Sequence, residues 1–201
     1  MRFFKFIIAA LVFTSLNFNG CASGSSPTSS ETERIFFDKL DLPSYDYVNG
    51  ELPLYRMVLK ANEKNINIES FAWEIYLQQL TLNKLKLFAY KDSSFTSPAY
   101  DVNPIAVNNR QIPDGKPDYY YGQYPLYTMS FPIDLAGKNR IALPLNVPIY
   151  FELKALMGIT GSEPSLGIYL EGAYLSDEPA AKKPVVLEYG ASKKPTLGFK
   201  N

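Results

Sequence analysis

The fold is decided by the stretch of residues 66–77, which reads INIESFAWEIYL. Over residues 71–77 the odd positions are apolar, whereas Glu74 falls on the opposite face. Alternation with a period of two, carried by β-branched and aromatic residues, is typical of a half-buried β-strand. The two isoleucines before Glu69 have the opposite phase, so we expect a bulge or a strand break at Glu69 and Ser70.

Similar patterns recur on both sides of this stretch, and each predicts a short strand. Trp73 shares the apolar phase and is expected in the core. Pro104 has no amide hydrogen, so a strand that contains it is expected at a sheet edge or a bulge. The predicted strands are residues 52–61, 71–77, 85–90, 99–107, 127–135, 140–145, 149–155 and 166–175.

Two segments lack a strand pattern. Residues 34–50 hold aromatic side chains without a clear period and are expected to form an irregular lead-in, and residues 108–125 a long, polar, tyrosine-rich loop. No segment after the leader shows a sustained apolar stripe of helical period, and 15 prolines also disfavour helices. We therefore predict an all-β fold over residues 34–176. It is an antiparallel β-sandwich of the immunoglobulin or transthyretin type with seven to eight strands.

The first 20 residues have the pattern of an export signal. Arg2 and Lys5 give a positive start, and residues 6–16 are apolar and uncharged, a run too short to span a bilayer as a helix. Residues 21–33 are rich in Ser and Thr and are expected to form a flexible tether. Residues 177–201 are expected to form a basic tail that contains Lys and Pro.

The junction between Gly20 and Cys21 resembles the lipobox of bacterial lipoproteins. This resemblance implies cleavage before Cys21 and a lipid on its thiol, although Phe18 and Asn19 depart from the aliphatic and small residues of the lipobox. Ordinary secretion with cleavage after Ala22 and an uncleaved anchor are the alternatives. All three place the body outside the cytoplasm, and the first makes it a membrane-anchored lipoprotein of the cell envelope, on its periplasmic or surface face.

Composition narrows the possible chemistry. The chain has no histidine and one cysteine, which removes Ser-His-Asp and Cys-His catalysis, His-ligated zinc and an internal disulfide. A basic stripe across the fold, as nucleic-acid binding needs, is missing, because five lysines gather in the last 20 residues and the body before them is acidic. We expect a protein that is not an enzyme, has no cofactor and does not bind nucleic acid.

The tyrosine-rich loop is the best candidate for a binding surface. Tyrosine offers a large amphipathic contact area to proteins and sugars, although these side chains would alternatively pack the loop onto the sandwich. Asp114 and Asp118 are weak candidates for a calcium site, because their spacing matches no EF-hand and Asp-Gly is a common turn. The candidate binding residues are Tyr119, Tyr120, Tyr121 and Tyr124.

Two longer stretches resemble a known surface module. Residues 70–102, with their LKLFAY strand and DSSFTSP turn, and residues 149–172, with YFELK and a Gly/Ser turn, resemble a β-sandwich module of exported proteins in candidate-phyla-radiation bacteria. The resemblance implies an immunoglobulin-like surface domain. In length, anchor and strand number the chain is also similar to the lipid-anchored lipoprotein of type VI secretion systems.

These observations lead to a functional hypothesis. We expect a non-catalytic envelope lipoprotein whose sandwich serves recognition, adhesion or envelope structure through a protein or glycan partner. The alternatives are a lipid-anchored subunit of a secretion or envelope assembly, and a glycan-binding module. Architecture alone does not distinguish them.

Overall fold

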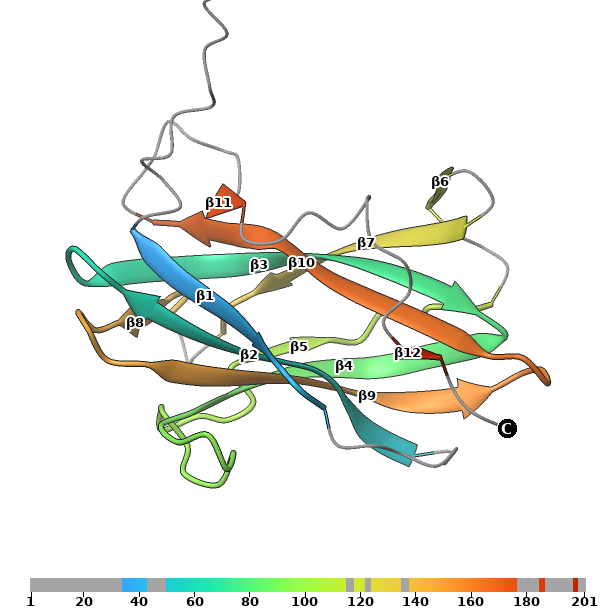
Figure 1. Ribbon diagram of the computed structural model, residues 1–201, viewed down its shortest axis with the longest axis horizontal. Coiled ribbons are helices and arrows are strands. Elements are labelled where there is room, and N and C mark those ends of the chain that lie inside the picture. Colours follow the sequence, from blue (N-terminus) through green and yellow to red (C-terminus); the bar gives the residue numbers. More distant parts are fainter. Residues whose placement is uncertain are drawn as a thin grey trace, which may run out of the picture.

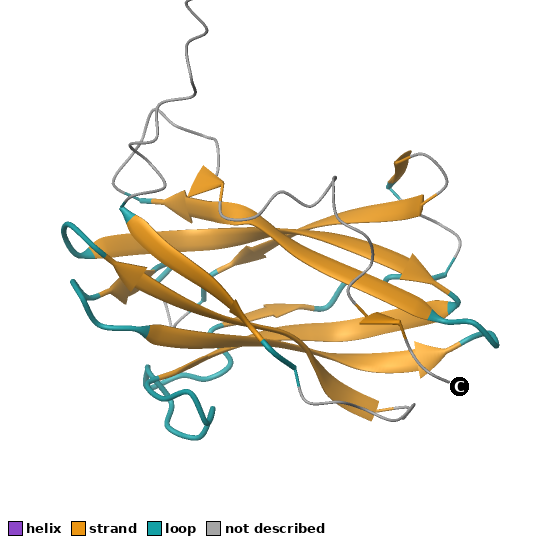
Figure 2. Cartoon of the chain, viewed as in Figure 1, coloured by secondary structure: helices purple, strands orange, loops and turns teal. Residues whose placement is uncertain are grey.

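The computed structural model describes residues 34–42, 50–114, 118–121, 124–134 and 138–176, and the backbone alone of residues 185–186 and 197–198. For residues 119–121 and 124–126 it describes only the backbone. Two antiparallel β-sheets pack face to face, with β2, β9 and β4 in the lower layer of Figure 1 and β10, β3 and β7 in the upper. The described residues contain no helix, and Figure 2 shows strands joined by loops. The predicted all-β sandwich is confirmed.

Sheet A has five strands, each antiparallel to its neighbours. Their order is β1 (Ile35–Leu40), β2 (Gly50–Ala61), β9 (Ile149–Ile159), β4 (Leu80–Tyr90) and β5 (Ala106–Asn108).

Sheet B is also antiparallel. Its order is β11 (Val185–Val186), β10 (Ser165–Leu175), β3 (Ile66–Gln78), β7 (Tyr124–Pro132) and β6 (Tyr119–Tyr121). Two further strands join it, β12 (Leu197–Gly198) beside β10 and β8 (Ile141–Leu143) beside β3.

The strand order corresponds to that of a constant-type immunoglobulin sandwich. Strands β1, β2, β9 and β4 lie in the order A-B-E-D of that fold, and β3, β10 and β11 in the order C-F-G. In this correspondence the chain between β4 and β9 is an insertion, which adds β5 to sheet A and β6, β7 and β8 to sheet B. Of the two sandwich types that the sequence predicted, immunoglobulin and transthyretin, the strand order therefore fits the immunoglobulin type.

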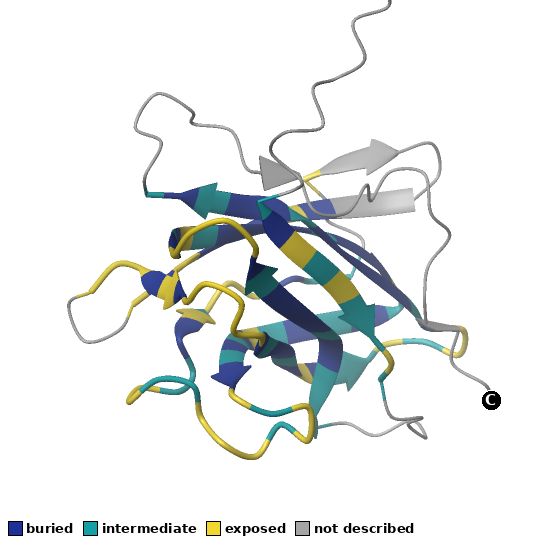
Figure 3. Cartoon of the chain, turned by 60° about the vertical axis from the view of Figure 1, so that its left-hand side comes forward, coloured by how far each residue is buried: buried dark blue, intermediate teal, exposed yellow. Residues whose placement is uncertain are grey.

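The core lies between the sheets and is centred on Trp73. This residue of β3 is 1% exposed, and its ring meets that of Tyr55 on β2 edge to face, with 4.9 Å between the ring centroids. The ring of Phe131 on β7 lies at 6.2 Å on the sheet B side. Figure 3 shows the buried residues mainly on the strands and the exposed ones mainly in the loops. The prediction that Trp73 belongs to the core is confirmed.

The phase slip in the sequence of β3 is a β-bulge. Tyr174 of β10 pairs with Ser70 and the next residue, Leu175, pairs with Ile68, so Glu69 is an extra residue on β3. Glu69 is exposed, whereas the isoleucine before it is fully buried. At the same point β3 changes its second partner from β7 to β8. The bulge predicted at Glu69 and Ser70 is therefore confirmed. It lies where β3 stops pairing with β7 and starts pairing with β8.

One residue carries the chain from sheet B to sheet A. Gln79 alone separates β3 from β4, and its φ of 54° lies in the left-handed region, which is uncommon for a residue other than glycine. The Gln79 carbonyl accepts a hydrogen bond from the amide of Thr160, and its side-chain Oε1 accepts one from the amide of Glu163, at 3.0 and 2.7 Å. This change of sheet is thus braced by the turn between β9 and β10.

Several expectations about local structure were wrong. Residues 34–50 are not wholly irregular, since β1 pairs with β2; exposed Phe36 lies between apolar neighbours and hides the alternation. Within residues 99–107 only Ala106 and Val107 belong to a strand, β5. The predicted loop at 108–125 contains β6 and the start of β7.

The number of strands was also underestimated. Strands β6, β11 and β12 were not predicted; they have two or three residues each, too few to show a period in the sequence, whereas β8 lies within the predicted strand at 140–145. Two of them, β11 and β12, fall within the segment predicted to be a tail, and both pair with β10.

Shortening Trp73 is expected to test how far the core depends on it. Trp73→Ala is expected to lower the free energy of unfolding by about 3–5 kcal/mol, because it leaves a cavity between the sheets. Among the described residues the buried Nε1 of Trp73 has no hydrogen-bond partner, so Trp73→Phe is expected to cost only about 1–2 kcal/mol. Urea unfolding of both variants measures the difference. Equal losses would contradict this account.

Candidate functional site

The tyrosine-rich segment forms a β-hairpin at one edge of sheet B. Strand β6 pairs with β7, Tyr119 opposite Leu126 and Tyr121 opposite Tyr124, and among the described strands it is the last one of sheet B. The four tyrosines predicted to bind a partner therefore stand on the two strands of one hairpin, Tyr119, Tyr120 and Tyr121 on β6 and Tyr124 on β7. Their side chains lie outside the part of the chain that the structure describes.

The hairpin is braced at its base by an ion pair. The Arg110 guanidinium donates through Nη1 and Nη2 to the two carboxylate oxygens of Asp118, at 3.1 and 2.5 Å. Asp118 also accepts a hydrogen bond from the amide of Thr128 on β7, at 2.9 Å, and Arg110 donates to the carbonyl of Thr128 at 3.1 Å. The hydrogen bonds from Arg110 hold the pKa of Asp118 below its ordinary value, and the same pairing raises the pKa of Arg110.

The segment before the hairpin is tied to both sheets. Asn108 of β5 donates through its side chain to the carbonyl of Ser130 on β7, at 3.1 Å. The hydroxyl of Tyr127 donates to the carbonyl of Pro113 at 2.6 Å, and buried Ile112 exchanges backbone hydrogen bonds with Leu82 of β4. The segment that leads into the hairpin is thus held by hydrogen bonds to strands of both sheets.

The two weak metal candidates accept hydrogen bonds from the protein. Asp114 accepts from the Gln79 amide at 3.0 Å and from the Thr160 hydroxyl at 3.1 Å, which ties it to the β3–β4 crossing and to the residue after β9. Asp118 belongs to the ion pair with Arg110. Within the described ranges no three His, Cys, Asp or Glu side chains are grouped so as to hold a metal ion. Both carboxylates therefore have structural partners.

The predicted attachment site, Cys21, lies outside the described residues. In the part of the chain that the structure covers, no helix has the length and apolar character needed to cross a membrane.

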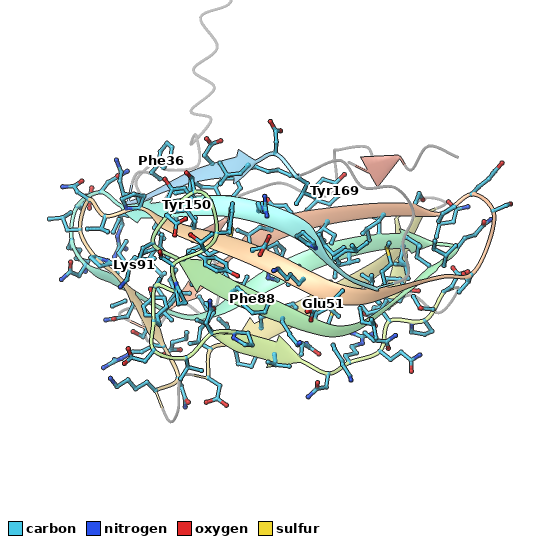
Figure 4. The ribbon with its side chains drawn as sticks, turned by 90° about the horizontal axis from the view of Figure 1, so that it is seen from below. Phe36, Glu51, Phe88, Lys91, Tyr150 and Tyr169 are labelled. Carbon is cyan, nitrogen blue, oxygen red and sulfur yellow. The ribbon has the colours of Figure 1, made fainter. Side chains whose placement is uncertain are left out.

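A second cluster of charged and aromatic side chains, which the sequence did not reveal, lies on the outer face of sheet A. We call it the Glu152 cluster, and it surrounds a carboxylate that is only 1% exposed. Arg56 of β2 donates through Nε and Nη2 to Oε1 of Glu152, at 2.9 and 2.7 Å, and Lys154 Nζ lies 2.9 Å from Oε2. Figure 4 views this side of the molecule and labels Tyr150 and Phe88, which belong to the cluster. Its members are Arg56, Phe88, Tyr90, Phe95, Tyr150, Glu152 and Lys154.

Aromatic rings cover the buried carboxylate. The Arg56 guanidinium carbon lies 4.1 Å from the centroid of the Phe95 ring, and that ring packs edge to face on Tyr90 and Tyr150, with centroids 5.6 and 6.2 Å apart. Burial and the nearby Glu152 carboxylate raise the pKa of Tyr90 to about 12. The phenol therefore stays protonated beside the carboxylate at neutral pH.

The loop that carries Phe95 projects below sheet A in Figure 1 and is organised by one aspartate. Asp92 accepts hydrogen bonds from the side chains of Ser94 and Thr96 and from the amide of Ser97, the last at 2.8 Å. These bonds, that of Ser94 first, lower the pKa of Asp92. Phe95 itself has a φ of 57°, so this hydrogen-bonded loop holds its ring over the sheet in a conformation that is rare for such a residue.

The Glu152 cluster was missed for a physical reason. Tyr150, Glu152 and Lys154 occupy alternate positions of a predicted strand, which places them on one face but does not say what that face contacts. Cross-strand register places Arg56 and Phe88 on either side of Glu152, although they are 96 and 64 positions away in sequence. The available signal was a Glu and a Lys two residues apart in one strand, which is too common to indicate a site.

No protein-family model matches the chain, and no curated protein matches its sequence. The fold defines the protein as a β-sandwich with immunoglobulin-type strand order, a class that supports many unrelated functions. Its function therefore has to be inferred from the surfaces described above.

Removing the charge of Asp118 is expected to loosen the hairpin. Asp118→Asn is expected to lower the free energy of unfolding by about 1 kcal/mol at pH 7, a modest loss because the pair is partly exposed. Because the folded-state pKa of Asp118 lies below its unfolded value, its stabilisation is present above pH 4 or so and is lost as the pH falls through the folded-state pKa. Urea unfolding at several pH values should show the variant and wild type converging in acid. Asp101→Asn, at another exposed aspartate, is the control and is expected to change little.

The effect of burial on the Glu152 ion pairs is tested by comparing a buried glutamate with an exposed one on the same sheet face. Glu152→Gln leaves Arg56 and Lys154 without their buried counter-charge, and about 2 kcal/mol of unfolding free energy should be lost, since both cations retain some contact with water. Glu51→Gln removes a carboxylate that also pairs with a lysine but is 44% exposed, so it is expected to cost about 0.5 kcal/mol or less. Chemical denaturation of the two variants compares them directly. A loss for Glu51→Gln as large as for Glu152→Gln would refute the proposed role of burial.

Proposed function

We propose that this protein is a non-catalytic lipoprotein of the bacterial cell envelope whose β-sandwich serves recognition. The observation that carries the proposal is a hairpin with four tyrosines at an open edge of sheet B, braced by Arg110 and Asp118. A rigid frame lowers the entropy lost when a surface binds, and tyrosine supplies contact area to proteins and to sugars.

The anchor in this proposal rests on the N-terminal sequence. An export-type leader precedes Cys21, and residues 22–33 contain no large apolar residue. The first strand begins at Ile35, so 13 residues, or 14 steps between successive Cα atoms, separate the predicted lipid site from the fold. A fully extended chain of that length reaches about 45–50 Å at most, which is enough to hold the domain clear of lipid headgroups.

The edge position of the hairpin suggests how a partner is bound. The outer side of β6 offers backbone groups for strand addition by a protein, and the tyrosines flank that edge. A protein partner would make this chain a lipid-anchored subunit of an envelope or secretion assembly. Glycan binding is the second candidate, because tyrosine rings also stack on sugars.

The recognition role is tested by removing two neighbouring tyrosines. Tyr120→Ala with Tyr121→Ala is expected to weaken binding to solubilised envelope proteins about tenfold or more, because both residues stand on the edge strand. Two assays are compared: pull-down of proteins from detergent extracts of the envelope, and binding to purified wall polysaccharide. The assay in which wild type binds identifies the partner as a protein or a glycan. Phe36→Ala, at an exposed aromatic of sheet A, is the control and should bind like wild type. Undiminished binding by the double variant to both fractions would exclude this hairpin as the recognition surface.

The anchor is tested separately. Intact mass of the protein extracted from membranes is expected to show a diacylglycerol group on residue 21, and Cys21→Ser is expected to release the protein from the membrane fraction. Soluble wild-type protein that begins at Ala22 or later would disprove lipidation.

A further inference from the structure

Three cations stand on neighbouring strands on the outer face of sheet A. We call Arg56, Lys154 and Lys86 the cationic row; they stand on adjacent strands β2, β9 and β4. Lys86 and Lys154 are direct register partners, which places two like charges opposite each other on one face. Such a pair destabilises a sheet unless anions compensate it.

The carboxylates of the protein neutralise the charge of these three cations only in part. Glu152 pairs with both Arg56 and Lys154, but its carboxylate is buried, with 2% of the side chain exposed. Lys86 pairs with Glu51 at 2.8 Å, on the exposed part of the face. Three cations are thus matched by two carboxylates, one of them beneath the surface. The side chains of Lys86 and Lys154 remain 32% and 28% exposed, so both lysines reach the surface of this face.

Apolar surface lies next to the cationic row. Lys154 Nζ is 5.1 Å from the centroid of the Phe88 ring, and Leu156, two residues further along β9, is 42% exposed. Residues two apart on a strand share a face, so Leu156 lies on the same side as Lys154. An anionic group held between the lysines would therefore have apolar surface beside it.

The pairing of the strands limits what can lie here. Strand β9 is hydrogen-bonded to β2 on one side and to β4 on the other, so the face offers no free backbone groups for a peptide strand. The face is also open, and an isolated small anion would stay largely in water. Charge, apolar contact and openness together favour a polymer whose repeating units carry both an anionic group and an apolar ring face.

We propose that the outer face of sheet A binds an acidic polysaccharide. Uronate carboxylates of the polymer pair with Lys86 and Lys154, and the apolar ring faces of neighbouring units pack against Phe88 on one side of the lysine pair and Leu156 on the other. This inference rests on the extracytoplasmic location proposed above, but it involves a different surface from the tyrosine hairpin.

The test uses the purified full chain and polygalacturonate, with the fully methyl-esterified and hence uncharged polymer for comparison. Wild type is expected to bind polygalacturonate and not to bind the methyl-esterified polymer. Its binding is expected to weaken as the salt concentration rises, because salt screens exposed charges. Lys86→Glu is expected to weaken binding about tenfold or more, because it places an anion opposite Lys154. Lys138→Glu, the same charge change at an exposed lysine between β7 and β8, is the control, and its affinity for polygalacturonate is expected to stay within about twofold of wild type.

Three results would overturn the proposal. They are no binding of wild type to polygalacturonate, equal loss in the two glutamate variants, and binding to phosphatidylglycerol vesicles without binding to the polymer. Lys86→Gln, which removes the charge without adding another, is expected to reduce binding less than Lys86→Glu and guards against a folding defect. Failure here leaves the Tyr120 and Tyr121 result untouched, so the two proposals fail separately.

Discussion

Trp73 of β3 meets Tyr55 of β2 edge to face at the interface between the two sheets, and the rest of the structure is arranged around that contact. In antibody domains the tryptophan of the third strand packs on a disulfide between the second and sixth. This chain has a single cysteine, so it cannot form an internal bridge. Here Tyr55 stands on the second strand and Leu170 pairs with Trp73 from β10. Burial of apolar surface replaces the covalent link as the main source of stability.

Once the sheets are held together, the insertion between β4 and β9 can extend the edges of the sandwich. It adds β5 beyond β4 and the β6–β7 hairpin beyond β3. Both additions are fixed by polar side chains, Asn108 to the backbone of β7 and Arg110 to Asp118. The sandwich thus carries two distinct surfaces, an aromatic edge on one sheet and a charged face on the other.

Much of the backbone was predictable because burial on one side of a sheet leaves a period of two. That period located β3 and β7, and its break at Glu69 located the bulge. The prediction failed where the period is short or masked. Phe36 is exposed between apolar neighbours and concealed β1. The tyrosines of the hairpin were found as a composition feature, but a cluster of like residues does not reveal that they sit on two paired strands.

The class of fold, the position of Trp73 in the core and the absence of histidine chemistry could be taken from the sequence, because they depend on residue type and local period. Which strands are neighbours became known only from the packed sandwich. That choice buried Glu152 between Arg56, Lys154 and Tyr90, and set Lys86 opposite Lys154. Cross-strand register joins residues that are far apart in the chain, and it is fixed by the packing of the whole sandwich, so no local pattern encodes it.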